Sequence, residues 1–343
     1  MNTSLDIPKP LLSVIIPCYN CAPVITRCLD SIDYKDCEII VVNDGSTDAT
    51  KEVVEKYASV RRNVRIITKS QGGVSSARNE GIRHASGKYI SYIDADDYIV
   101  SGGLERIVQI AEQYDADVVK FKWRTVTDND EIDKASVVEY PIQTEQTTAR
   151  DVLKRHDISD FIVWDGVYRR SVIIDNGIAF KEDLQLHEDD VFMGMLYCHA
   201  DKVIATDLPL YRYVAASNYS STHRQTIDKQ RKLIMSGLKA VGYRKDYVGK
   251  YYPQVLPMER LKYMRWVCLL REAIRAEMNY KEYVHLLRSF QKKGVYPLDY
   301  HWIEIAGWDK WSRPWIKRLI QTFMVNHLYI GWPLAKIYYK YRI

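Results

Sequence analysis

Short apolar runs alternate with segments of helical periodicity in the first part of this 343-residue chain. Four runs are rich in β-branched and aromatic residues and have the length of buried strands: residues 11–16, 38–42, 64–68 and 89–93. A segment with apolar positions on one helical side follows each of the first three runs. This β-α-β-α-β-α-β order with short loops predicts an α/β domain with a doubly wound, mostly parallel, Rossmann-like sheet.

The same rules predict further elements up to His223. These are a helix at 104–114, a strand at 118–126, a strand or turn at 171–174, a helix at 191–198, and short strands at 203–205 and 210–214. After His223 the pattern becomes basic and amphipathic, with helices predicted at 229–241, 258–278 and 281–292. We therefore expect two parts, an α/β domain at 1–223 and a helical C-terminal region at 224–343.

The excess of positive charge lies in the C-terminal region, where 24 Lys and Arg residues oppose 9 Asp and Glu residues within a net charge of +5 for the chain. Bases mixed with aromatic residues, as at 314–343, are typical of helices at a membrane surface. A helical bundle packed on the first domain and a homodimer interface are alternatives. No run reaches the roughly 20 apolar residues of a membrane span, and the N-terminus lacks the pattern of a signal peptide. We expect a cytoplasmic protein, peripheral on the inner face of the membrane.

The six cysteines show no disulfide framework, and the Cys18-x-x-Cys21 pair lacks the second ligand pair that a structural zinc ion needs. The basic C-terminal region carries no readable nucleic-acid motif, so we expect no nucleic-acid partner.

The predicted strand at 89–93 ends abruptly in acid, with Asp94, Asp96 and Asp97. Unpaired carboxylates are costly to bury, so these should lie at the carboxyl end of the strand, where open α/β sheets bind ligands. Asp94 and Asp96 are two residues apart and face the same way in extended chain. They suit Mg²⁺ or Mn²⁺, whose shell is completed by water and phosphate oxygens. An acidic turn that caps the following helix is the alternative.

Three other loops place related chemistry on the same sheet edge. Tyr19 follows the first strand and could lie against a flat base, and Asp44 ends the second strand and could accept from a base N–H or a ribose hydroxyl. Arg78 follows a pair of glycines and could pair with a phosphate or with an acid of the same site. Each residue also fits ordinary packing, a turn or a helix surface. Together they indicate a nucleotide-diphosphate site.

Four motifs in this order resemble those of family 2 glycosyltransferases with the GT-A fold: residues 13–20 (SVIIPCYN), 41–48 (VVNDGSTD), 72–81 (GGVSSARNEG) and 92–97 (YIDADD). The resemblance covers residues 11 to about 223 and leaves the C-terminal region uncovered. It implies an inverting transfer of a sugar from a nucleotide-diphosphate sugar, often a UDP-sugar, to an acceptor hydroxyl.

The resemblance also implies roles for individual residues. Pro17, Tyr19 and Asp44 would hold the nucleoside, and the motifs add Asn20, Gly72, Arg78 and Ala95 to the nucleotide-sugar site. Asp94 and Asp96 would form the metal-binding DxD motif. Glu188 and Asp189 match the family's late Glu-Asp motif, whose Asp is the general base. Asp190 is a rival base, since the chemistry alone would accept either carboxylate.

Trp164 and Asp165 lie where the family places acceptor-side residues. Similar enzymes have Trp, then Asn or Asp, then Lys in this segment, whereas here Gly166 replaces the Lys. His223 could reach the metal or the diphosphate, although a lone histidine is more often structural.

We therefore expect a Mn²⁺- or Mg²⁺-dependent inverting glycosyltransferase that acts on a glycan or lipid-linked acceptor in capsule, exopolysaccharide or O-antigen synthesis. One alternative is a sugar-1-phosphate nucleotidyltransferase, which would need a Gly-rich, Arg-bearing loop where this chain has 17–20. The other is a non-catalytic nucleotide-sugar-binding protein, against which the acidic pair and the candidate base argue.

Overall fold

The computed structural model describes residues 9–127, 143–155, 161–215, 227–251, 278–292 and 333. The chain divides into two compact units. Unit 1 consists of Met1–Asp183 and Glu188–His223, and unit 2 consists of Leu184–His187 and Arg224–Ile343.

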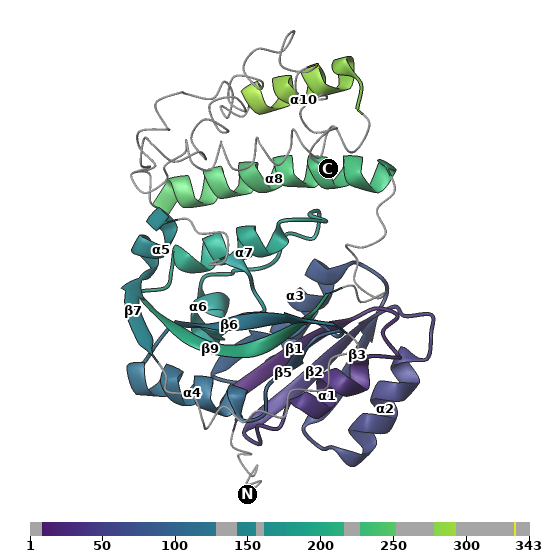
Figure 1. Ribbon diagram of the computed structural model, residues 1–343, viewed down its shortest axis with the longest axis vertical. Coiled ribbons are helices and arrows are strands. Elements are labelled where there is room, and N and C mark those ends of the chain that lie inside the picture. The colour runs from purple at the N-terminus through teal and green to yellow at the C-terminus, as the bar shows by residue number, and fades with distance from the viewer. Residues whose placement is uncertain are drawn as a thin grey trace, which may run out of the picture. The chain divides into compact units, whose positions relative to one another are not determined.

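The first half of unit 1 is a parallel sheet in the order β3-β2-β1-β4. Figure 1 labels β1, β2 and β3 of this sheet. Its strands are β1 (Leu12–Cys18), β2 (Cys37–Asp44), β3 (Val64–Lys69) and β4 (Tyr89–Tyr92). The helices that connect them are α1 (Ile25–Ser31), α2 (Thr50–Val60) and α3 (Val74–His84). Successive β1 residues face opposite sides of the sheet: Val14 and Ile16 join the core formed with α1, and Ile15 meets α3 at Gly81. The predicted doubly wound parallel arrangement is confirmed.

The second half extends the sheet to nine strands and mixes directions. Strand β8 (Gly166–Arg169) runs antiparallel between β4 and β6 (Val118–Val126), and β9 (Lys202–Val214) pairs parallel with β6. The short strands β5 (Tyr98–Ile99) and β7 (Thr144–Thr148) both pair antiparallel with β9. The helices of this half are α4 (Gly103–Tyr114), α5 (Ala149–Arg155), α6 (Arg170–Asp175) and α7 (Glu188–Tyr197).

Three local predictions are wrong. Strand β1 continues through Pro17, because β4 pairs with β1 only as far as Ile15 and no ladder bond is needed from the nitrogen of Pro17. The two short strands predicted at 203–205 and 210–214 form the single strand β9, in which register shifts against β6 accommodate Pro209. Residues 171–174 lie in helix α6 rather than in a strand or turn.

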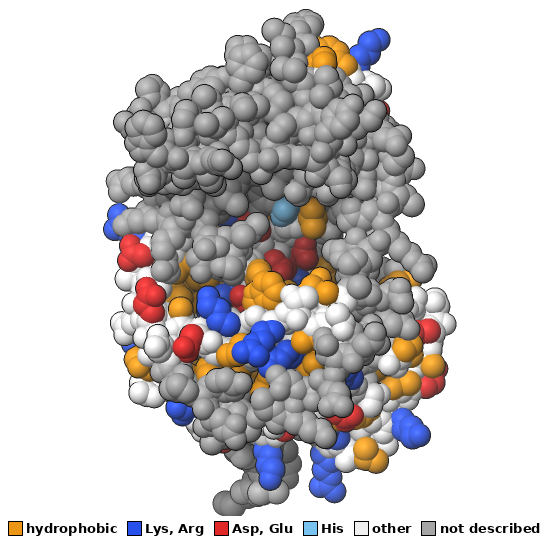
Figure 2. All heavy atoms as spheres, viewed as in Figure 1, with side chains coloured by type: hydrophobic (Ala, Val, Ile, Leu, Met, Phe, Trp, Pro, Cys, Tyr) orange, Lys and Arg blue, Asp and Glu red, His pale blue; other side chains and the backbone are white. Residues whose placement is uncertain are grey.

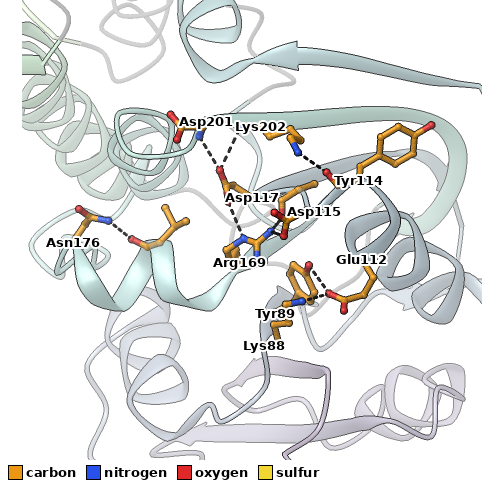
Figure 3. Close-up of polar contacts among 12 residues, drawn as sticks. Lys88, Tyr89, Glu112, Tyr114, Asp115, Asp117, Arg169, Asn176, Asp201 and Lys202 are labelled. Atoms are coloured by element: carbon orange, nitrogen blue, oxygen red, sulfur yellow. Dashed lines mark hydrogen bonds and ion pairs between the residues drawn. The ribbon is translucent and has the colours of Figure 1, made fainter.

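A polar network joins the strands at the end of the sheet opposite the carboxyl ends of β4, β6 and β9 (Figure 3). The Asp117 carboxylate accepts from Arg169 Nε at 2.8 Å and from the backbone N–H of Asp201 and Lys202 at 2.8 and 3.2 Å. Arg169 also donates to Asp115 Oδ1 at 2.6 Å. These bonds fix the starts of β6 and β9 against the end of β8, which holds the register of the second half.

Unit 2 contains α8 (Ile227–Tyr251) and α10 (Tyr280–Lys292), which overlap two of the predicted C-terminal helices. The Ser236 hydroxyl of α8 accepts from the backbone N–H of Gln185 and Leu186 at 2.8 and 3.0 Å. The predicted helix at 258–278 lies almost wholly outside the described residues, and 314–343 lies outside them except for residue 333. Within the part of the chain that the structure describes, no helix is both long and apolar enough to cross a bilayer.

Candidate functional site

The carboxyl ends of the parallel strands β1 to β4 lie at one edge of the sheet, and the loops that follow them carry most of the predicted site residues. Asn20 joins the first two loops. Its backbone N–H donates to Ser46 Oγ at 3.0 Å, and its Oδ1 accepts from the Thr47 N–H at 2.8 Å. Asn20 has a φ of 51°, a conformation that Asn tolerates better than most residues. The neighbouring Tyr19 side chain is 46% exposed, so its ring is available for contact with a ligand.

Asp44 is buried at the end of β2 and binds the loop that follows β3. Its carboxylate accepts from Gly72 N at 2.9 Å, Gly73 N at 2.7 Å and Lys69 Nζ at 2.8 Å. A Cβ at position 72 would lie 2.8 Å from both Lys69 Nζ and Ser76 Oγ, and Gly73 has a φ of 89°. In this structure Asp44 therefore positions the glycine loop, with its oxygens already engaged by three donor residues.

Arg78 brings together two motifs that are distant in the sequence. Its side chain extends from α3, is almost wholly buried, and lies over the ring of Phe180 with 5.3 Å between the guanidinium carbon and the ring centre. Nη1 lies 2.6 Å from Asp189 Oδ1 and 3.4 Å from Glu188 Oε1, and Nη2 lies 3.0 Å from Asp94 Oδ1. Burial acts to lower the pKa of Arg78, but the three carboxylates outweigh it and raise the pKa.

The acidic loop after β4 is held by contacts from helix α1 and strand β9. Arg27 of α1 donates to the Asp96 carbonyl at 2.6 Å, and Ala95 between the two acids is buried. Tyr211 of β9 accepts from the Asp94 N–H at 3.1 Å and donates to Asp97 at 2.7 Å. Burial, together with the charges of Asp94 and Asp96, raises the pKa of Asp97 to about 8.

Asp94 and Asp96 are the residues of this loop that the sequence predicts as ligands of a divalent metal. Among the described residues, no group of three or more His, Cys, Asp and Glu side chains could hold an ion without other ligands. A metal bound by the two carboxylates alone would complete its shell with water and diphosphate oxygens, as Mg²⁺ usually does. The accumulated negative charge that raises the pKa of Asp97 also suits a cation.

Asp189 lies in the first turn of α7, with its side chain 23% exposed. Burial raises its pKa to about 7; the charges of Glu188 and Asp94 add to this rise, whereas Arg78 and the Val163 N–H oppose it. The neighbouring Asp190 is buried more deeply, with 9% of the residue exposed. Of the two rival carboxylates, Asp189 is the less buried.

The segment with Trp164 and Asp165 lies beside Asp189 through the Val163 backbone. Asp165 is buried and forms an ion pair with Lys120 of β6, which also donates to the Ile162 carbonyl at 2.7 Å. Trp164 stacks on Tyr211 with ring centres 4.3 Å apart. The segment is therefore in contact both with the candidate base and with the tyrosine that supports the acidic loop. His223 lies outside the described residues.

Sequence reasoning missed Lys120 and Tyr211. A signal for Lys120 was present, because a lysine among the apolar residues of a predicted buried strand needs a partner. Tyr211 gave no comparable signal, since a tyrosine in a strand is ordinary. In the space-filling view, acidic side chains lie next to a group of hydrophobic side chains near the centre of the visible face (Figure 2).

The fold and the site define a class: a doubly wound α/β protein with an acidic, ligand-accessible site at the carboxyl edge of its sheet. Residues 13–177 match Glycosyl transferase family 2, and the chain belongs to this family. The crystal structure of S. aureus TarS 1–349 in complex with UDP-GlcNAc is similar, with a TM-score of 0.54 and 20% identity, covering 83% of this chain and 88% of that one. This likeness confirms the predicted GT-A fold.

Two relatives are closer in sequence. The uncharacterized glycosyltransferase EpsJ of Bacillus subtilis (strain 168) is 36% identical over 215 residues, which are 60% of this chain and 61% of EpsJ. The uncharacterized glycosyltransferase YibD of Escherichia coli (strain K12) is 32% identical over 246 residues, 69% of this chain and 68% of YibD. The chain thus spans less than two thirds of the length of EpsJ and about two thirds of that of YibD.

Proposed function

We propose that this protein is an inverting glycosyltransferase of polysaccharide synthesis that moves a sugar from a nucleotide-diphosphate sugar, with a UDP-sugar as the first candidate, to an acceptor hydroxyl. One observation carries the proposal. Asp94 of the acidic loop and Asp189 of α7, the candidate metal ligand and the candidate base, contact different nitrogens of the same Arg78 guanidinium.

The chemistry assigns a step to this arrangement. The Asp189 carboxylate takes the proton of the acceptor hydroxyl, and the oxygen attacks the anomeric carbon of the donor sugar. The bond from that carbon to the diphosphate breaks, and the electron pair leaves with the nucleoside diphosphate. A pKa of about 7 suits this role, because a general base works best when its pKa lies near the working pH. The Asp189 oxygens accept from Arg78 and from the Val163 N–H, which orients the carboxylate and leaves lone pairs for the hydroxyl.

Asp94 and Asp96 would hold Mn²⁺ or Mg²⁺, which would neutralise charge on the leaving diphosphate when bound. Tyr19, Asn20, Pro17, Gly72 and Ala95 would complete the donor site. The UDP-GlcNAc complex of the structural neighbour TarS supports a UDP-sugar as the donor. We propose a glycan or lipid-linked acceptor, and we propose that the C-terminal region binds the inner face of the cytoplasmic membrane or a second copy of the chain.

The test measures release of the nucleoside diphosphate from a panel of UDP- and GDP-sugars, with Mn²⁺, with Mg²⁺ and with a chelator. We expect turnover of at least one donor with metal, and loss of turnover with the chelator. Asp189→Asn should lower transfer by roughly 10²–10⁴-fold, since it removes the general base, while the affinity for UDP stays close to that of the wild type.

The matched control is Asp190→Asn, one residue away, with its melting temperature measured in parallel. This variant should retain transfer as long as it remains folded. Equal losses in the two folded variants would contradict the assignment of the base, and nucleotide-sugar binding without turnover under any condition would favour a non-catalytic binding protein.

A further inference from the structure

Four aromatic side chains form a continuous group beside the candidate base, and we call them the aromatic cluster: Trp123, Trp164, Tyr211 and Tyr213. The ring of Trp164 stacks on Tyr211 at 4.3 Å and faces Tyr213 at 6.0 Å, with interplanar angles of 24° and 12°. Trp123 of β6 meets Trp164 edge to face at 5.7 Å and Tyr213 at 6.2 Å. Trp123 is 40% exposed, so the outer end of the cluster faces solvent.

The cluster is rigidly supported. The Lys120–Asp165 ion pair is buried, and the Tyr168 hydroxyl donates to the Val163 carbonyl at 2.7 Å. These bonds fix the backbone on both sides of Trp164, and the Trp164 ring stacks with two tyrosine rings. The exposed Trp123 packs edge to face on this fixed group. An aromatic ring packed in this way loses little conformational freedom when a ligand binds, which favours affinity.

The inner end of the cluster contacts the acidic loop and follows a residue that is bonded to the candidate base. The Tyr211 hydroxyl bonds to the Asp94 N–H and to Asp97, and the residue before Trp164 gives its N–H to Asp189. The rings therefore continue outward from the candidate base. The loops expected to hold the donor, with Tyr19 and Gly72, follow β1 and β3, whereas the cluster comes from β6, β9 and the segment before β8.

We propose that Trp123, together with Trp164 and Tyr213, forms the surface on which a pyranose ring of the acceptor glycan stacks. The C–H face of a pyranose is apolar and covers an aromatic ring, while its hydroxyls at the rim stay available for hydrogen bonds. Exposed single apolar residues are ordinary, but this one is the outer member of a supported group that leads to the base. The inference rests on the proposed glycosyltransferase function and adds the chemical class of the acceptor and the residues that select it.

The test uses the full chain and three disaccharides as probes: cellobiose, lactose and N,N′-diacetylchitobiose. Ligand-observed NMR titration gives the dissociation constant of each. We expect the wild type to bind at least one of them, Trp123→Ala to weaken that binding by roughly tenfold, as the loss of one aromatic contact implies, and Trp123→Phe to retain most of it. The control is Ile174→Ala, which removes another exposed apolar side chain of unit 1, outside the cluster, and should change nothing.

Hydrolysis of nucleotide sugars without acceptor separates this inference from the proposed function, because it needs the donor site alone. Trp123→Ala should hydrolyse the donor at the wild-type rate. The stacking surface would be overturned if Trp123→Ala bound the disaccharides as well as the wild type does, or if the wild type bound none of them. Donor hydrolysis by the wild type would still leave the enzyme assignment intact. A wild-type protein that neither binds nor hydrolyses any nucleotide sugar would instead remove the proposed function, and the acceptor surface with it.

Discussion

Replacing Arg78 with methionine should move the pH dependence of sugar transfer toward higher pH. The ionised Asp189 carboxylate is the form that accepts a proton, so kcat/KM should be high above its pKa and should fall as the pH drops through about 7. Arg78 stabilises the ionised form through a contact of 2.6 Å. Without this cation, burial and the charges of Glu188 and Asp94 act unopposed, apart from the Val163 N–H, so the pKa of Asp189 should rise.

The size of the shift follows from the geometry. An opposite charge within ~4–6 Å typically lowers a carboxyl pKa by about 1–3 units, and each unit corresponds to about 1.36 kcal/mol. From a starting pKa of about 7, a rise of one unit lowers the ionised fraction near neutral pH from about one half to about one tenth. Ionisation alone should therefore reduce transfer near neutral pH by at least about fivefold.

The assay is a pH profile of kcat/KM for Arg78→Met, for Arg78→Lys and for the wild type, with melting temperatures measured across the same range. Arg78→Lys keeps the charge but lacks the planar guanidinium group that reaches both Asp94 and Asp189. The acidic limb of its pH profile should therefore lie between those of the wild type and Arg78→Met. The reasoning is refuted if Arg78→Met is folded and its acidic limb coincides with that of the wild type, whatever happens to the plateau.

Two further predictions concern stability and can be tested by urea unfolding. Lys120→Met should lower the free energy of unfolding by about 3–5 kcal/mol, because it removes the cation that pairs with the buried Asp165 carboxylate. The double variant with Asp165→Leu should recover much of this loss. A double variant as unstable as Lys120→Met would contradict this account. Gly87→Ala should lower the free energy of unfolding by about 1–3 kcal/mol, since a Cβ at position 87 would lie 2.6 Å from the Ser13 backbone nitrogen. Gly249→Ala in α8 is the control: a Cβ at position 249 would have no atom within 4 Å, so this variant should be neutral or slightly stabilising.

The parallel half of the sheet could be predicted because its information is local. Each of its strands is an apolar run followed by a polar loop and a helix, so periodicity alone gave the order that the structure confirms. The second half depends on contacts that a local pattern does not contain. Pro209 appeared to divide β9 into two strands, and only the register shifts against β6 keep it whole.

The candidate site also contains residues whose place the sequence predicts and contacts that it does not predict. Tyr19, Asp44 and Asp94 could be placed at one edge because parallel strands bring their carboxyl ends together. The partners of these residues could not be read, because Arg78 and Asp189 are 111 positions apart and Tyr211 and Asp94 are 117 apart. Asp44 illustrates the limit, since its carboxylate meets the glycine loop, a contact that its turn-like sequence did not indicate.

Gly166 and Lys120 are paired on the neighbouring strands β8 and β6, next to Asp165. A Cβ on Gly166 would lie 2.6 Å from the hydroxyl oxygen of Tyr168, which is buried and bonded to the Val163 carbonyl, so no longer residue fits without displacing that ring. The lysine that similar enzymes carry at this position is therefore excluded here. Asp165 still needs a cation because it is buried, and Lys120 supplies it from the neighbouring strand β6. The segment beside Asp189 is thus held in place by a charge that comes from β6.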